Sequence, residues 1–174
     1  MENEREAEHF ISVLRQAIKA LAEDDSVKLK ELSNMTIHSA SIFQDTDSIT
    51  IAILIYSLSK IVERREHLKI KNWGNFTRKF NLAVSIAAKS LEQDRRDKFT
   101  HYLEMARKTI TSISPNLKPA IQDVLRKASI NKASKIYEHG ISMEQTAKLL
   151  GITQWELSEY TGQTGISDVN YNKT

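Results

Sequence analysis

The amino-acid sequence predicts an all-α protein, and three observations lead to this fold class. The 174 residues include only 5 Gly and 2 Pro, too few turn formers for a sandwich built from many hairpins. The chain is 40% hydrophobic and 27% charged, as expected for a protein with a buried core. Apolar residues recur at helical spacing in most segments. We therefore expect a helical bundle over residues 1–114 that serves dimerisation or partner binding, a helix-turn-helix module over 115–165, and a flexible tail over 166–174.

Composition also excludes several kinds of site. The chain has no Cys, which removes disulfides, thiolate zinc sites and thiol nucleophiles. Four histidines lack the spacing of zinc ligands, namely His9, His38, His67 and His139. There is no Gly-rich phosphate loop and no GxSxG motif. The sequence thus predicts neither a metal site nor a cofactor.

The location expected from the sequence is cytoplasmic. Met1 is followed by acidic residues instead of the basic and apolar regions of a secretory signal. The most apolar stretch, Ile49–Val62, is shorter than the roughly 20 residues of a membrane span and is predicted to be a central core helix. We expect no contact with a membrane.

Three helices are expected before residue 64. The first has one apolar face, made of Phe10, Leu14, Ala17, Ile18 and Leu21. Residues 24–26 supply a cap for a second helix, and Asp45–Ser48 begins the apolar third helix. An alternative use of Asp45 and Asp47 is to hold a divalent cation, but no third acid stands at a defined spacing from them.

A basic stretch over residues 63–80 precedes the next two helices, and Gly74 at its centre is expected to mark a bend or a boundary. The two helices have core stripes of Phe80, Ala83, Val84, Ala87, Ala88 and Leu91, and of Phe99, Leu103, Ala106, Ile110 and Ile113. Another helix is predicted from Pro119 to about His139, with Gly140 in the left-handed conformation at its end. The sequence shows no internal repeat and no low-complexity tract.

Start signals for two short helices follow close together. Residues 142–145 match an S-x-x-Q capping box, and residues 153–156 match a T-x-x-E capping box. Ala147 is small enough for the two helices to approach each other, and Gly151 suits a turn that requires a positive φ. The segment around Ile136 is expected to be a third helix, packed across this pair. This pattern predicts a helix-turn-helix.

The same segment resembles the helix-turn-helix of small prokaryotic, especially archaeal, transcriptional regulators and antitoxin-like proteins. The shared core is A-x-x-L-G-I-[ST]-x-W-E, present here as Ala147, Leu150, Gly151, Ile152, Thr153, Trp155 and Glu156. It covers about a fifth of the chain, whereas residues 1–114 match no family that we recognise. The resemblance implies sequence-specific DNA binding or a regulatory partner, usually as a homodimer.

The second helix of the pair would present its first turns to the major groove of duplex DNA. Predicted base contacts are Thr153, Gln154 and Ser158, and predicted phosphate contacts are Arg126, Lys127, Lys132, Lys135 and Lys148. This helix carries no Arg or Lys, and Glu156 and Glu159 would repel phosphates. An alternative is therefore that the pair docks on a protein or a ribonucleoprotein.

Positive charge is concentrated in the middle of the chain, where residues 60–108 carry 13 basic and 6 acidic side chains. The sequence predicts a secondary basic patch of Arg64, Arg65, Lys69, Lys71, Trp73, Arg78 and Lys79. Cations beside aromatic rings are typical of RNA or single-stranded DNA binding. Two alternatives stay open: Trp73 and Phe76 anchor the loop to the core, or the N-terminal acids neutralise the patch.

Arg96 and His101 fit the R-x4-H spacing of the HEPN ribonucleases, which are helical bundles. The resemblance implies metal-independent RNA cleavage, with the His as general base and the Arg stabilising the phosphorane. Such a short pattern arises easily by chance among 25 basic residues. We therefore expect a non-enzymatic nucleic-acid-binding regulator, a homodimer that prefers duplex DNA to RNA, with a protein partner and a ribonuclease as the alternatives.

Overall fold

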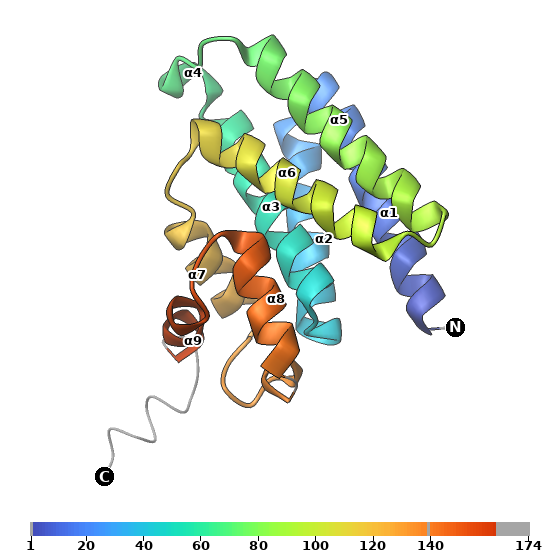
Figure 1. The fold of residues 1–174 in the computed structure, drawn as a ribbon. Coiled ribbons are helices and arrows are strands. Elements are labelled where there is room, and N and C mark those ends of the chain that lie inside the picture. The colour runs from blue at the N-terminus through green and yellow to red at the C-terminus, as the bar shows by residue number, and fades with distance from the viewer. Residues whose placement is uncertain (1, 139, 163–174) are drawn as a thin grey trace.

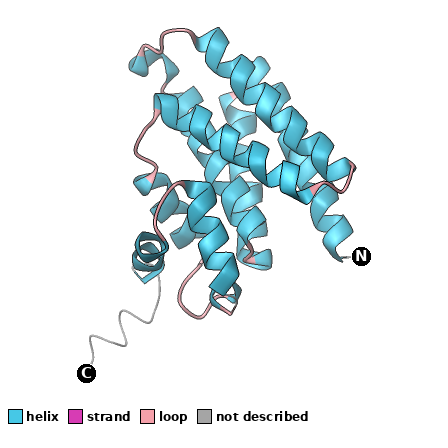
Figure 2. Ribbon diagram, viewed as in Figure 1, coloured by secondary structure: helices cyan, strands magenta, loops and turns pink. Residues whose placement is uncertain are grey.

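The computed structural model describes residues 2–138 and 140–162 (Figure 1), and its regular elements there are all helices (Figure 2). The predicted all-α class is confirmed. The N-terminal elements are α1 Glu2–Ala22, α2 Ser26–Phe43, α3 Thr46–Glu63, the single turn α4 Arg65–Leu68, α5 Trp73–Glu92 and α6 Arg96–Ile113. The C-terminal elements are α7 Lys118–Lys127, the 3-10 helix η1 Lys135–Tyr137, α8 Gly140–Leu150 and α9 Gln154–Gly162. The tail predicted over 166–174 lies outside the described residues.

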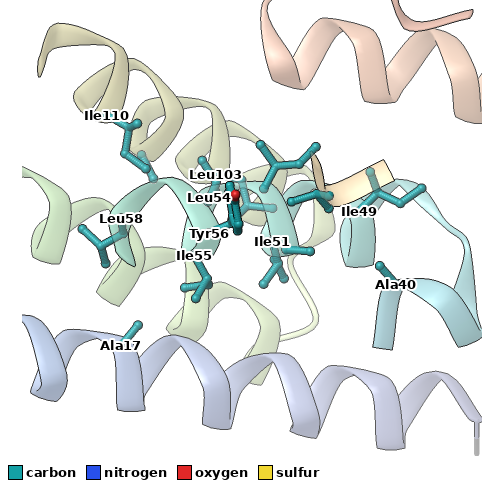
Figure 3. Close-up of a cluster of buried hydrophobic side chains, with 14 of the residues drawn as sticks. Ala17, Ala40, Ile49, Ile51, Leu54, Ile55, Tyr56, Leu58, Leu103 and Ile110 are labelled. Atoms are coloured by element: carbon teal, nitrogen blue, oxygen red, sulfur yellow. The ribbon is translucent and has the colours of Figure 1, made fainter. Parts of the chain in front are cut away.

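The helix α3 occupies the centre of the fold, as its apolar sequence predicts. All its residues from Ser48 to Ser59 are buried, and α2, α6, α7 and α8 pack against it. Figure 3 shows its side chains meeting Ala17 of α1, Ala40 of α2 and Leu103 of α6. A helix that is apolar around its whole circumference is stable only with neighbours on every side.

Among the described residues, none of the helices combines the length and the apolar character that a membrane span requires.

The predicted caps of the second and third helices are confirmed. The Asp25 carboxylate accepts a hydrogen bond from the Lys28 amide at 3.0 Å at the start of α2. At the start of α3, Asp45 accepts from the Ser48 amide at 2.9 Å, and the Asp45 amide donates to the Ser48 hydroxyl at 3.3 Å. These bonds satisfy amides that the first helical turn leaves unpaired. Among the described residues, no group of three or more His, Asp or Glu side chains is placed to hold a metal ion.

The structure contains a repeat that the sequence analysis missed. The hairpin of α1 and α2 recurs 70 positions later as the hairpin of α5 and α6, with Asp24 (φ 56°) matching Asp94 (φ 58°) in the turn. Both turns close with the same pair of backbone bonds, from the left-handed residue and the one after it. Identical pairs at this offset are Phe10 and Phe80, Ala17 and Ala87, Lys19 and Lys89, Leu21 and Leu91, Lys28 and Lys98, and Met35 and Met105. The repeat is hard to detect from the sequence because most other core positions differ between the two copies.

The predicted long helix from Pro119 to about His139 is wrong, because α7 ends at Lys127. Ser129 adopts a left-handed conformation with φ 57°, and the Ile130 amide donates to the Leu125 carbonyl at 2.8 Å. This arrangement usually has Gly at the left-handed position, so no residue of this segment signals the end of the helix. The expected third helix around Ile136 is only the short η1. His139 lies outside the described residues.

Two further expectations about glycine and capping positions are wrong. Gly140 begins α8 and does not have a positive φ. Ser142 lies inside α8, where its carbonyl accepts from the Thr146 hydroxyl at 2.7 Å, so residues 142–145 form no capping box. Gly74 lies in the first turn of α5, so it marks the boundary that was one of its two expected roles, and the bend lies at Lys69 and Asn72, which have φ of 47° and 59°.

The turn between α8 and α9 matches its prediction. Gly151 has a φ of 72°, in the region that favours glycine. The Glu156 amide donates to the Thr153 hydroxyl at 3.0 Å, and the Thr153 amide donates to the Glu156 carboxylate at 3.1 Å. These reciprocal bonds are the predicted T-x-x-E capping box.

The C-terminal helices pack against the N-terminal ones through a continuous core, whose buried residues run from Phe10 to Tyr160. Side-chain hydrogen bonds join α8 to this core, including one from the Thr146 hydroxyl to the Thr46 hydroxyl at 2.9 Å. The Thr46 hydroxyl at the start of α3 donates to the Ser142 carbonyl at 3.0 Å, and Arg107 Nε in α6 donates to the Leu149 carbonyl at 3.1 Å. The direction of α8 is therefore fixed by both α3 and α6.

Candidate functional site

The side of α9 that faces away from the core is exposed to solvent. Gln154 and Glu159 are exposed, and Trp155 is 70% exposed although it is a large aromatic residue. The inner side of the helix packs through Leu157 and Tyr160 against α7 and α8. Gln154 and Trp155 are thus free to contact a partner.

Thr153 and Glu156 are engaged in the cap of α9. The Glu156 carboxylate accepts hydrogen bonds from both the amide and the hydroxyl of Thr153, each at 3.1 Å. The backbone bond, followed by the hydroxyl bond, lowers the pKa of Glu156 below its ordinary value, so this side chain stays anionic. Its negative charge is therefore directed back at the helix N-terminus, where the helix dipole favours it.

Ser158 turns inward and is only half-exposed. Its hydroxyl hydrogen-bonds to Tyr137, whose pKa is raised mainly by burial and lowered by this bond. The Tyr137 hydroxyl also bonds to the Thr161 hydroxyl. Of the three predicted base contacts, only Gln154 therefore has an exposed side chain with no role in a cap or an internal bond among those described.

The structure separates the predicted phosphate contacts. Lys132 lies beside α9, because a Cβ built on Gly162 would be 3.4 Å from its Cε. Lys148 instead lines a groove of about 400 Å³ with His101 and Glu104 of α6. Lys135 is exposed in η1. A cation that the sequence analysis missed, Lys118, lies near α9, with its Nζ 5.8 Å from the centre of the Tyr160 ring.

Arg126 and Lys127 belong to a different surface, centred on Tyr56. The Tyr56 hydroxyl of α3 donates to Asp123 of α7 at 2.7 Å, and Arg126 pairs with Asp123 at 3.4 Å. Lys127 Nζ lies 4.9 Å from the centre of the Tyr56 ring. Arg64, predicted as part of the secondary basic patch, lines the groove beside Tyr56. The fold thus joins members of two predicted cation sets that are far apart in the sequence.

Electrostatics keep the Tyr56–Asp123 pair in one protonation state. Burial, followed by the bond to Asp123, raises the pKa of Tyr56 to about 12. The bond from Tyr56 lowers the pKa of Asp123, with further lowering from Arg126 and Lys127. Tyr56 is consequently a neutral donor and Asp123 an anionic acceptor near neutral pH.

The rest of the secondary basic patch is partly committed to contacts within the chain. The Arg65 guanidinium lies 4.6 Å from the centre of the Trp73 ring and pairs with Asp24. Trp73 packs on buried Phe76 with ring centroids 5.2 Å apart. This arrangement agrees with the alternative in which the aromatic residues anchor the loop. The remaining members, Lys69, Lys71, Arg78 and Lys79, are exposed.

Arg96 and His101 have different partners in the described part of the chain. Arg96 donates to the Asp47 carboxylate at 3.0 Å. His101 is exposed, packs edge-on against Tyr102 at 5.0 Å and lines the groove that contains Lys148. An Arg whose guanidinium is already paired with a carboxylate is less able to stabilise a developing phosphorane charge.

Comparison of this chain with known protein families, curated proteins and solved structures gives no match.

Proposed function

We propose that the protein is a nucleic-acid-binding regulator in which α8 and α9 form a helix-turn-helix and α9 contacts duplex DNA. The observation that carries this proposal is the pair of short helices joined at Gly151, with the first turn of α9 exposed. A recognition helix needs a rigid support and an exposed N-terminal face. Arg107 supports α8 from within the fold, and Gln154 is placed on that exposed face.

The contacts expected with DNA are fewer than those predicted from the sequence. Gln154 can read adenine through its amide, which is a bidentate partner for that base. Lys132 and Lys118, which flank α9, are the candidates for phosphate contacts. Lys148 faces α6 and is not expected to contribute.

One observation favours docking on a protein as the second candidate. Trp155, the neighbour of Gln154 in α9, is 70% exposed, and α9 has no Arg or Lys. Exposed Trp residues are frequent anchors of protein interfaces. If α9 docks on a protein, the affinity for that partner should depend on Trp155 and only weakly on salt.

Fluorescence anisotropy on the full chain tests the proposal, with duplexes selected from a random pool and with unselected duplexes over a salt series. We expect Gln154→Ala to reduce the preference for selected duplexes, at a cost of about 1–3 kcal/mol. Lys132→Ala should weaken binding to all duplexes alike and reduce the salt slope by about 1. Lys148→Ala is the matched control and should leave binding unchanged. Absence of salt-dependent duplex binding by the unaltered protein would refute DNA recognition and favour docking through Trp155.

A further inference from the structure

The surface over Tyr56 gathers cations from two helices. Lys60 of α3 and Lys127 of α7 place their Nζ atoms 5.5 and 4.9 Å from the centre of the Tyr56 ring. Arg64, at the end of α3, lines the groove next to Lys60. These three cationic side chains are exposed to solvent.

Two carboxylates near these cations, Asp123 and Glu63, offset part of this charge, and Asp123 itself lines the adjoining groove. Asp123 already accepts from the Tyr56 hydroxyl at 2.7 Å and from Arg126 at 3.4 Å. Lys60 is 3.9 Å from Glu63, a distance typical of a weak, solvent-exposed pair. Like charges held close together repel each other, and an anion bound among them would remove that repulsion.

A groove of about 350 Å³ lies beside these cations, between α3, α4, the end of α6 and the start of α7. Its volume is within the range of small-molecule sites. Leu68 and Ile113 give it an apolar wall, and Asn116 supplies an amide at its rim. Ser57, which also lines the groove, is 5% exposed, and its hydroxyl has no hydrogen-bond partner among the described residues. Buried hydroxyls normally have such a partner.

We propose that this groove binds a nucleotide phosphate, carried either by a free nucleotide or by a single RNA strand. The Arg64 guanidinium suits two phosphate oxygens at once, and Lys60 and Lys127 add positive charge beside it. The apolar wall accommodates the base, and Asn116 and Ser57 provide polar contacts. The site uses no residue of α9, so it goes beyond the DNA contact proposed above.

Titration calorimetry of the full chain with adenosine monophosphate tests whether the groove binds a free nucleotide. Fluorescence anisotropy with a labelled uridine decamer tests whether it binds a single RNA strand. The double variant Lys60→Ala/Arg64→Ala should lower the affinity for the ligand that binds by at least about tenfold, because it removes two charged contacts to the phosphate. Lys19→Ala/Lys89→Ala is the matched control, because it removes two exposed lysines at equivalent positions of the repeated hairpins. We expect its affinity to stay within twofold of the unaltered protein.

Binding of the monophosphate alone identifies a nucleotide site, and tighter binding of the decamer identifies a strand site. The proposal is overturned if neither ligand binds, or if the control variant loses as much affinity as the groove variant. Gln154→Ala should not affect either ligand. Failure of duplex recognition and failure of this site are therefore distinguishable.

Discussion

The substitution Gly151→Ala tests how the turn between α8 and α9 is built. Gly151 has a φ of 72°, and a Cβ at this position would lie 2.8 Å from Cζ and Nη1 of Arg107. The Arg107 side chain can move, but it would then lose the bond from its Nε to the Leu149 carbonyl at 3.1 Å. The substitution therefore combines backbone strain with the loss of a contact between α6 and α8.

The two costs can be separated by magnitude. A residue other than glycine in the left-handed region costs about 1 kcal/mol. A hydrogen bond from a charged donor contributes about 1.5 kcal/mol. We expect Gly151→Ala to lower the free energy of unfolding by about 2.5 kcal/mol in the unaltered protein, and by about 1 kcal/mol when Arg107 is already alanine.

Urea denaturation followed by circular dichroism measures both values in a double-mutant cycle. The predicted coupling between Gly151 and Arg107 is about 1.5 kcal/mol, well above the usual error of additivity between independent sites. If Gly151→Ala lowers the free energy of unfolding equally in both backgrounds, contact with Arg107 does not contribute to the effect of the substitution. A cost below about 0.5 kcal/mol in the unaltered protein would show that the turn does not need glycine.

Two further predictions concern the repeated turns and the buried acids. Asp94→Gly should raise the free energy of unfolding by up to about 1 kcal/mol, because Asp94 has a φ of 58°. Asp24→Gly should raise it less, because that change also removes the ion pair with Arg65. Urea midpoints of the two variants measure the difference, and an equal gain would contradict the prediction. Burial, with a smaller contribution from a hydrogen bond to Asp45, raises the pKa of Glu6 from 4.5 to about 8, so the folded state disfavours the charged carboxylate and the protein loses stability as pH rises through this range. The Glu6→Gln variant should therefore be more stable than the unaltered protein at pH 8, by at most about 5 kcal/mol, and equally stable below about pH 4.5. Urea midpoints at both pH values measure the difference. A gain in stability that does not depend on pH would refute the role of ionisation.

Local sequence signals predicted the helices of the N-terminal part well. The caps at Asp25 and Asp45 depend on side chains that bond to amides three residues away, and such short-range bonds can be read from spacing alone. The same holds for the Thr153 cap and for Gly151. The end of α7 could not be predicted, because Ser129 takes the left-handed conformation without the glycine that usually signals it.

The candidate site was predicted only in part. Gln154 was predicted as a base contact because it lies in the first turn of the second helix of the pair, and its side chain is exposed in the structure. The inward turn of Ser158 depends on Tyr137, and no pattern within α9 indicates that neighbour. Lys148 was grouped with the DNA contacts because it lies near them in the chain, whereas the packing of α8 directs it toward His101.

The sequence by itself determined the helical class, the buried central helix and the turn at Gly151, because periodicity, caps and a positive φ are properties of neighbouring residues. The tertiary structure alone decided which charges act together. Tyr56 and Asp123 are 67 positions apart, and only the packing of α7 against α3 brings them to 2.7 Å. That packing also brings Lys127 Nζ to 4.9 Å from the centre of the Tyr56 ring, to which Lys60 Nζ is 5.5 Å. Side chains distant in the chain share a surface only after burial of the apolar faces has fixed the helices, so no local pattern records the cation cluster over Tyr56.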